Sequence, residues 1–417
     1  MDNKETIWRD YLGIGLLASV IISLLDYSRD GYLHIALVIT FLFIAGLKDS
    51  LYILLSFIRK YTVFFVLVMI LTIYFRFFSR TEPLSDKFAL SAFLLVFFGY
   101  IIGLMNDGNN EIYSLMWKAL MVLGVAALFH HAQVFQNGER MSMAFQNPVL
   151  EADAMIAFLL ISILYIDNMR QKIAGIALSS VCIVLTSVRV CMIMAFFIIL
   201  FFLLLHRDII KKRILQTDCK RRRLLLGVVI ICILLLIFIY KDSCFKILIL
   251  TTSRFGALFR VLKGDFSLGN DYSIGTRVLA IREILRLYPK GSIIELLLGR
   301  GQLHGYYAIK NSMAELTGIN AASEYAGPIE NTFLSILYDY GLCSFILYAI
   351  VFIKVIISAI VDKNGSVRKA AIFSMCIIIL SLFVDMEYWM NLSFVLFSGI
   401  GIYLGIKDKC KYGCVQM

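Results

Sequence analysis

Long apolar runs recur along nearly the whole chain, and this pattern constrains it to fold in a membrane. A helix that crosses the hydrocarbon core of a bilayer needs about 20 mostly apolar residues. The composition agrees, with 60% hydrophobic and 17% charged residues and a mean hydropathy of +0.84. We predict an all-α polytopic membrane protein with about 12 transmembrane helices, at 10–26, 31–48, 61–79, 88–106, 112–130, 150–166, 171–187, 190–206, 223–240, 341–361, 370–385 and 389–406.

Basic residues gather in alternate connections between these runs. The densest cluster, "HRDIIKKRILQTDCKRRR" from His206 to Arg223, joins two predicted spans. Short loops rich in lysine and arginine stay on the cytoplasmic side, so this orientation places the basic groups at 4–9, 48–60, 170–172, 363–369 and 407–411 inside as well. Both termini are then predicted to be cytoplasmic. The net charge of +11 is explained by topology, and we expect no nucleic-acid partner.

One connection is much longer than the others. The segment from Lys241 to Tyr340 faces outward in this orientation and is the candidate for an extramembrane domain. We therefore divide the chain into an N-terminal membrane region (1–240), a large outer loop domain (241–340) and a C-terminal membrane region with a short cytoplasmic tail (341–417). The two membrane regions carry about nine and about three of the predicted spans.

The stretch "GTRVLAIREILRLYPKG" predicts a helix within this outer loop, with Thr276 as its N-cap and Pro289 as its stop. Successive residues of a helix are 100° apart. This spacing puts one set on a face that we expect to contact the protein or the membrane surface: Arg277, Ile281, Ile284 and Tyr288. Another set should point elsewhere: Arg282, Glu283 and Arg286.

Arg189 stands where two apolar runs meet with almost no connection, in "LTSVRVCMIM". An arginine at the centre of a bilayer costs at least ~2.5–3.5 kcal/mol on insertion scales. It could extend to the outer headgroups, or it could be a fixed cation that binds an anionic group. We favour the second interpretation because Arg277 offers a partner. A guanidinium stays charged and binds phosphate oxygens through parallel hydrogen bonds, and Arg254, Arg282 and Arg286 could contribute further positive charge.

Glu330 and Asn331 precede the helical pattern of "NTFLSILYDYG". A carboxylate at the start of a helix is favoured by the helix dipole, and Asn331 could cap the same helix. The alternative is chemical, because a carboxylate at a membrane surface can also take the proton of a sugar hydroxyl. Both interpretations stay open for Glu330.

Other polar features carry weaker signals. "LGRGQLHG" includes Gly299 and Gly301, which we interpret as a turn, and His304, which is either a surface histidine or a substrate ligand. The acid pairs Glu151/Asp153 and Asp385/Glu387 resemble metal-binding pairs, but two-residue patterns are common. The nine cysteines are scattered and lack metal-ligand spacing. We expect neither a metal nor another cofactor.

Four stretches together resemble the O-antigen polymerase and O-antigen ligase superfamily of bacterial membrane enzymes. They are "TSVR" at 186–189, "TRVLAIREIL" from 276, "LLLGRG" at 296–301 and "ENTFLSILYDYG" at 330–341. The resemblance implies a GT-C-like membrane fold in the bacterial cytoplasmic (inner) membrane, with the active site facing outward. It also implies undecaprenyl-pyrophosphate-linked oligosaccharides as substrates, and a chain-length regulator is a further expected partner. Arg189 and Arg277 match the family's essential arginines, which are expected to bind the donor pyrophosphate.

The last motif departs from the ligases, which typically have a histidine where this chain has Glu330. The departure favours a polymerase of O-antigen or capsule repeat units, with Glu330 as the base or acceptor-positioning group and Arg254, Arg282, Asn331 and His304 as further substrate ligands. A ligase-type glycan transferase is the near alternative. A flippase for lipid-linked oligosaccharides is a second alternative, disfavoured because the spans contain few charges and the outer loop is large.

Overall fold

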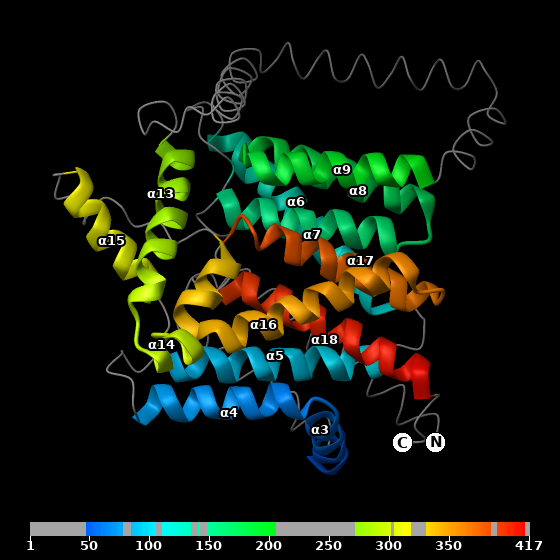
Figure 1. The fold of residues 1–417 in the computed structure, drawn as a ribbon. Coiled ribbons are helices and arrows are strands. Elements are labelled where there is room, and N and C mark those ends of the chain that lie inside the picture. Colours follow the sequence, from blue (N-terminus) through cyan, green and yellow to red (C-terminus); the bar gives the residue numbers. More distant parts are fainter. Residues whose placement is uncertain are drawn as a thin grey trace, which may run out of the picture. The chain divides into compact units, whose positions relative to one another are not determined.

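Every element described in the computed structural model is a helix (Figure 1). The structure describes residues 47–77, 85–105, 111–134, 141, 148–205, 272–301, 304–317, 331–384 and 390–412. The predicted spans at 10–26, most of 31–48, and 223–240 lie outside these residues. Within the described part of the chain, the all-α prediction is confirmed.

The helices follow the apolar runs of the sequence closely. The helices that correspond to predicted spans are α4 (Thr62–Phe77), α5 (Ser85–Met105), α6 (Glu111–Val134), α7 (Pro148–Leu164), α8 (Met169–Thr186), α9 (Arg189–Leu205), α16 (Thr332–Val361), α17 (Gly365–Leu380) and α18 (Met390–Tyr412). The others are α3 (Leu47–Lys60), α13 (Tyr272–Leu287), the 3-10 helix η2 (Tyr288–Lys290), α14 (Ile293–Leu298) and α15 (His304–Thr317).

Two described helices, α8 and α16, are long and apolar enough to cross a membrane. The segments Leu51–Lys60 and Thr62–Phe77 are bent by 97° relative to one another, and they would make a third span if the pair counts as one. Shorter apolar helices include Ala89–Leu104, Met116–His131 and Arg189–Leu203. These apolar helices are consistent with a membrane protein, and the number of about 12 spans stays a prediction.

The chain divides into two compact units, each described by itself. The first comprises residues 1–119 and 272–417, and the second comprises 120–271. The boundary between them falls within α6. The sequence-based division at 240 and 340 stays a prediction.

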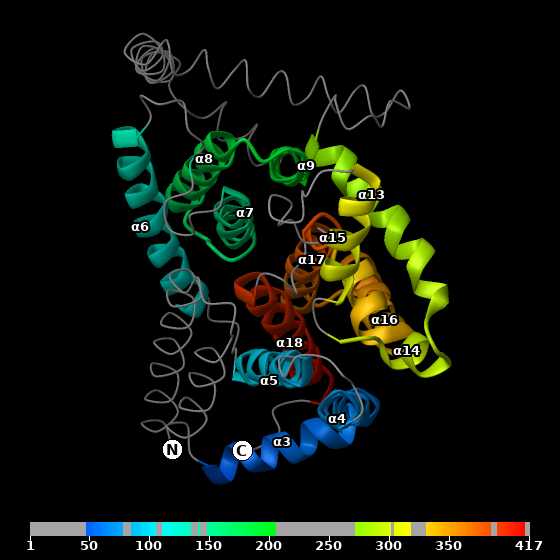
Figure 2. The same cartoon turned by 90° about the vertical axis from the view of Figure 1, so that its left-hand side faces the viewer.

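The core of the first unit is the packing of α18 along α5, helices from opposite ends of the sequence (Figures 1 and 2). Glycines let the two backbones touch. A Cβ on Gly99 would overlap the carbonyl of Ser398, and one on Gly405 would overlap that of Tyr100. Phe57, Phe93 and Phe97 lie in the buried cluster formed next to this contact.

One end of the first unit collects three of the basic groups that were predicted to be cytoplasmic. The carboxylate of Asp408 pairs with Lys60 at 2.5 Å and accepts hydrogen bonds from Tyr61 and Tyr100, each at 3.0 Å. Asn364, in the connection between α16 and α17, donates to the sulfur of Cys410 at 3.3 Å. The groups around residues 60, 364 and 408 are therefore on one side of this unit, as a shared cytoplasmic location requires.

In the second unit, α7, α8 and α9 pack together (Figure 2). A Cβ on Gly124 of α6 would contact the side chain of Leu178 of α8. The thiol of Cys182, also in α8, lies 3.8 Å from the Gly124 carbonyl oxygen. The helices α8 and α9 carry exposed Val181 and Phe201. Exposed apolar side chains of this kind suit a surface that faces lipid.

Candidate functional site

The first unit contains a close contact between two backbone segments, residues 299–301 and 338–341, which we call the glycine clamp. The N–H of Gly301 donates to the carbonyl of Asp339 at 2.8 Å, and that of Arg300 donates to the carbonyl of Tyr338 at 3.4 Å. Gly341 breaks α16 with a φ of 76°, and Gly299 has a φ of 89°. The φ of Gly301 is 109°, so the prediction of a turn at Gly299 and Gly301 agrees with the positive φ of both.

The clamp needs glycine on both sides. A left-handed φ is strained for a residue with a Cβ. In addition, a Cβ on Gly341 would overlap the carbonyl of Leu297, and a Cβ on Gly299 would overlap that of Asp339. The motifs "LLLGRG" and "YDYG" are therefore two halves of one structural feature, which explains why both are present.

Arg300, between the two clamp glycines, points into the protein. Its Nη2 donates to the carbonyls of Leu287 and Tyr288, at 3.1 and 3.4 Å, and its guanidinium lies 4.4 Å from the centroid of the Tyr338 ring. Its Nε is 3.9 Å from a carboxylate oxygen of Glu295. A cation at the carbonyl end of a helix is stabilised by the dipole. Arg300 thus joins the end of α13 to the clamp.

Asp339 holds α15 from the other side of the clamp. The buried carboxylate of Asp339 accepts a 2.7 Å hydrogen bond from the N–H of Gly305, in the first turn of α15. His304, the first residue of α15, donates its own N–H to the carbonyl of Gly301 at 3.2 Å. Burial and the positive charge of Arg300 lower the pKa of His304 from its ordinary value, against the opposing effect of Glu295. At neutral pH its imidazole is therefore uncharged.

The helix α13 corrects two expectations. It begins at Tyr272, so Thr276 lies inside the helix and the prediction of an N-cap there is wrong. Its stop is confirmed, because η2 follows directly and contains Pro289. Glu283 was expected to point away from the protein but is buried, and it pairs with Arg286 at 2.6 Å.

The packed face of α13 is centred on Ala280 and Ile284, both fully buried against Ile309 and Tyr338. Arg277 precedes Ala280 by one turn and is half-buried, whereas Arg282 is exposed. A helical wheel alone could not show which residues lie at the middle of this packed face, because the apolar residues of α13 cover more than one side of the helix.

Asn331 is the N-cap of α16. Its side-chain oxygen accepts the N–H of Leu334 and its Nδ2 donates to the carbonyl of Leu382, both at 3.0 Å. The next residue, Thr332, donates its hydroxyl to the carbonyl of Val384 at 2.6 Å. The capping interpretation of Asn331 is therefore confirmed, and its part in substrate binding stays a prediction. Glu330 and Arg254 lie outside the described residues.

Arg189 is the first residue of α9, in the second unit. The preceding helix, α8, ends at Thr186, and its C-cap Ser187 has a left-handed φ of 55°. The carbonyl of Leu185 accepts the N–H of Met141 at 3.2 Å. Arg189 is half-buried and stands at the positive end of an apolar helix. Arg277 belongs to the other unit, so the pairing of the two arginines stays a prediction.

The predicted acid pair Glu151/Asp153 is buried in the first turns of α7, each residue 2% exposed. One oxygen of Asp153 accepts the thiol of Cys191 at 3.1 Å, and the other has no hydrogen-bond partner in the described part of the chain. No group of three or more potential metal ligands occurs among the described residues. Asp385 and Glu387 lie outside them.

Sequence reasoning missed Arg300, Asp339 and Asp153 as organising residues. Arg300 and Asp339 stand in motifs that the sequence had already singled out. The available signal was a polar residue between two glycines for Arg300 and between two tyrosines for Asp339. Asp153 was considered only as a metal ligand. Its contact with Cys191 joins α7 to α9 and depends on how the helices pack.

A comparison with known families matches residues 174–349 to the family model described as O-antigen ligase. No curated protein matches the chain. The matched region contains all the predicted site residues: Arg189, Arg254, Arg277, Arg282, His304, Glu330 and Asn331. Members of this family are glycan-processing membrane enzymes, and together with the apolar helices the family indicates a bacterial inner-membrane location. The match over residues 174–349 thus supports a relationship of this region to the O-antigen ligase and polymerase superfamily.

Proposed function

We propose that this protein polymerises polysaccharide repeat units at the outer face of the cytoplasmic membrane. It transfers a growing glycan from a polyprenyl-pyrophosphate donor to a lipid-linked repeat unit. The observation that carries the proposal is the position of Arg189, a cation at the N-terminus of an apolar helix within the region that matches the family. A lipid pyrophosphate combines an anionic head with an apolar chain, and this position offers a match for both.

The reaction follows from the charges involved. A hydroxyl oxygen of the acceptor sugar attacks the anomeric carbon of the donor glycan, and the bond from that carbon to the phosphate oxygen breaks. The electron pair leaves with the lipid pyrophosphate, so the transition state gains negative charge where Arg189 and Arg277 are proposed to bind. Positive charge already in place lowers that barrier without reorganisation. Glu330 is proposed to accept the proton of the attacking hydroxyl.

The half-buried Arg277 is proposed to act with Arg189, while Arg254, Arg282, Asn331 and His304 contribute to substrate binding. His304 is neutral at neutral pH, so it suits a hydrogen bond to a sugar hydroxyl better than an ion pair with phosphate. Asn331 uses its side chain to cap α16, so its contribution is to hold the start of α16 next to Glu330.

The proposed orientation is consistent with the positions of basic groups in the first unit. Three basic groups lie at one end of the first unit, near Lys60, Asn364 and Asp408. Clustering of lysine and arginine on one side is the pattern of a cytoplasmic surface. With this end inside, the start of α16, with Asn331, is proposed to face outward.

A ligase is the second candidate, since the matching family model is described as O-antigen ligase. The two functions differ in the acceptor. Purified protein in liposomes, supplied with one lipid-linked repeat unit as the only glycan, separates them. A polymerase produces a ladder of lipid-linked oligomers, because the repeat unit is both donor and acceptor. A ligase produces no ladder, since its acceptor is missing.

Variants of Glu330 refine the same assay. Glu330→Gln keeps the size of the side chain and removes its basicity, so we expect the ladder to shrink by at least tenfold in rate. Glu330→His tests the difference from the ligases. A ladder of normal rate and length from Glu330→Gln would contradict the role of Glu330 while leaving the polymerase proposal intact.

A further inference from the structure

A lysine is held between the last turns of α16 and α18, on the side of the first unit where both helices end (Figure 1). The Nζ of Lys407 donates hydrogen bonds to the hydroxyls of Ser358 and Tyr403, each at 2.9 Å. These two residues are buried, and their hydroxyl oxygens lie 2.7 Å apart. A surface lysine normally moves freely on its flexible stem, whereas two buried hydroxyls hold this ammonium in one position.

No acid neutralises Lys407 within the described part of the chain. The next residue, Asp408, pairs with Lys60 and accepts hydrogen bonds from two tyrosines. Asp362, the C-cap of α16, accepts the N–H of Asn364 at 3.0 Å. An ammonium has three N–H donors, and the two hydroxyls take two of them. One donor and a full positive charge are therefore left for a ligand.

A second cation stands next to this lysine. Lys354 is exposed and precedes Ser358 by about one turn of α16. Its backbone carbonyl accepts the hydroxyl of Tyr403 at 3.4 Å, and its side chain forms no ion pair among the described residues. Two cations on one part of the surface raise the positive potential there. Lys354 and Lys407 together favour an anion.

The apolar surface beside these lysines indicates what kind of anion fits. α16 is long and apolar enough to cross a membrane. Exposed isoleucines recur along it at the spacing of one helix face: Ile346, Ile350, Ile353, Ile357 and Ile360. This isoleucine stripe covers about 21 Å at 1.5 Å per residue. At 100° per residue, Lys354 falls between the stripe and Ser358, so the cations lie beside a surface that suits a hydrocarbon chain.

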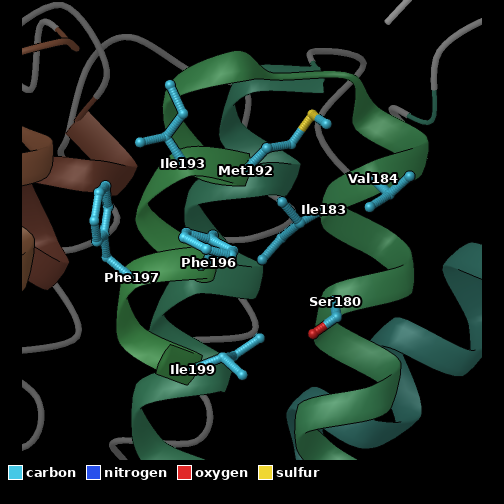
Figure 3. Close-up of a pocket in the computed structure, with 9 residues that line it drawn as sticks. Ser180, Ile183, Val184, Met192, Ile193, Phe196, Phe197 and Ile199 are labelled. Carbon is cyan, nitrogen blue, oxygen red and sulfur yellow. The ribbon is translucent and has the colours of Figure 1, made fainter. Parts of the chain in front are cut away.

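The groove between α8 and α9, in the second unit, provides a contrast (Figure 3). Its apolar lining includes Ile183 from α8 and Met192 and Phe196 from α9. The only hydroxyl among its described lining residues belongs to Ser180, which donates to a carbonyl of its own helix at 2.6 Å. The hydrocarbon of any lipid can contact such a surface. The groove therefore cannot select a headgroup, but a fixed cation can.

We propose that Lys407 and Lys354 bind the phosphate of an anionic phospholipid, such as phosphatidylglycerol, while an acyl chain lies along the isoleucine stripe. Basic pockets between transmembrane helices at the cytoplasmic side bind anionic headgroups in this way, and this end of the unit is the one predicted to be cytoplasmic. Ser358 and Tyr403 position the ammonium, and the bound lipid connects α16 to α18. The inference does not depend on the proposed function.

Site-specific photo-crosslinking in the full-length protein tests the site. A benzophenone amino acid replaces Ile357, which is in the stripe and 54% exposed, or Phe196, which lines the groove and is 62% exposed. The protein is placed in vesicles of phosphatidylethanolamine and phosphatidylglycerol, in which one lipid or the other carries a radiolabel. The ratio of phosphatidylglycerol adduct to phosphatidylethanolamine adduct should be at least threefold higher at position 357 than at position 196.

Three variants separate a positioned cation from general surface charge. Lys407→Gln should lower the adduct ratio at position 357 to that at position 196. Arg59→Gln removes an exposed cation next to Lys60 and should leave the ratio unchanged. Ser358→Ala keeps every charge and removes only one anchor of the ammonium, so a fall of at least twofold is expected. The melting temperature of each variant checks that it is folded.

Each contrary outcome has its own meaning. Equal ratios at positions 357 and 196 would mean contact with bulk lipid and would overturn the inference. An equal loss in Arg59→Gln and Lys407→Gln would overturn it as well, since the preference would then come from net charge. Loss of the preference on adding inorganic phosphate at constant ionic strength would assign the lysines to a soluble anion instead. None of these readouts involves glycan transfer, so a failure of the proposed function would leave the lipid site standing.

Discussion

The molecule breaks two of its apolar helical segments with a left-handed residue, at Gly341 and at Ser187, and the two breaks differ in what surrounds them. At Gly341 the backbone of Leu297 and Gly299 fills the space, leaving no room for even one methyl group. At Ser187 the chain turns and then begins a helix with Arg189, beside an apolar groove. Both residues have a positive φ, but ψ is 178° at Gly341 and 31° at Ser187. The neighbours of a break decide its role.

The largest expected effect is on stability and tests the break at Gly341. Gly341→Ala adds a methyl group that overlaps the carbonyl of Leu297 and strains a φ of 76°. Strain and overpacking together should cost on the order of 3–5 kcal/mol of stability. The measurement is the temperature at which the detergent-solubilised protein loses its monodisperse peak.

Gly365→Ala is the matched control, because nothing lies within 4 Å of a Cβ at that position. It should melt at or slightly above the temperature of the unmodified protein. If Gly341→Ala melted together with Gly365→Ala, the clamp would be looser than its contacts indicate, and the contrast between the two breaks would disappear.

The second effect concerns Arg189, next to the break at Ser187, and should appear in the activity of the protein. Arg189→Ala removes a charge proposed to stabilise the leaving pyrophosphate, so the initial rate of glycan transfer should fall about 100-fold or more. Arg189→Lys keeps the charge but loses the paired hydrogen bonds, and an intermediate rate is expected. Melting should change little in either variant.

Arg170→Ala removes an exposed arginine from the other end of α8 and serves as the control. Its rate should stay within twofold of the unmodified protein. A normal rate in Arg189→Ala would remove the pyrophosphate role, and a large loss of stability would make the second break structural like the first.

A third, smaller effect tests whether the charged side chain of Arg300 stabilises the glycine clamp. Arg300→Met keeps much of the side-chain volume but removes the hydrogen bonds to Leu287 and Tyr288 and the contact with Tyr338. The expected loss of stability is about 2 kcal/mol. Lys290→Met, an exposed cation in the adjacent turn, should melt like the unmodified protein. Equal melting of both variants would show that the glycine contacts hold the clamp alone.

The smallest effect is a pH dependence at His304. Because the pKa of His304 is lowered in the folded protein, the unfolded chain binds a proton in the window below the ordinary value of 6.5 that the folded chain does not. The stability should therefore fall as pH falls from about 6.5 towards the folded pKa, and this contribution should be constant above that window. His304→Gln should flatten the melting profile there. An unchanged profile would contradict a half-buried, neutral histidine.

The positions of the helices could be predicted from the sequence, but the geometry of the breaks between helical segments could not. Apolar runs gave the positions of α4 to α9 and of α16 to α18 because a membrane helix must be apolar along its length. The continuation of α16 through Gly341 escaped prediction, since the break was taken as the boundary between an outer helix and a span. Its geometry depends on Gly299, some forty residues away in sequence.

The candidate site was predictable by residue type only. Arg189 stood out because a charge between two apolar runs is costly, and this physical argument needs no structure. The structural roles of Arg300 and Asp339 come from backbone groups that they bind across the fold. Glu283 was misplaced because its burial depends on a partner, Arg286, one turn away. Sequence patterns identify polar residues, but their partners come from packing.

The contact between α5 and α18 has a consequence for how the protein is made. The glycine surface of α5 is synthesised early, but its partner begins only at Met390, about 285 residues after α5 ends. At 5–20 residues per second, the ribosome takes roughly 15–60 seconds to cover that length. During this interval the glycine face of α5 must be covered by lipid or by a membrane chaperone. Truncation before α18 would leave that face uncovered permanently and direct the shortened chain to degradation.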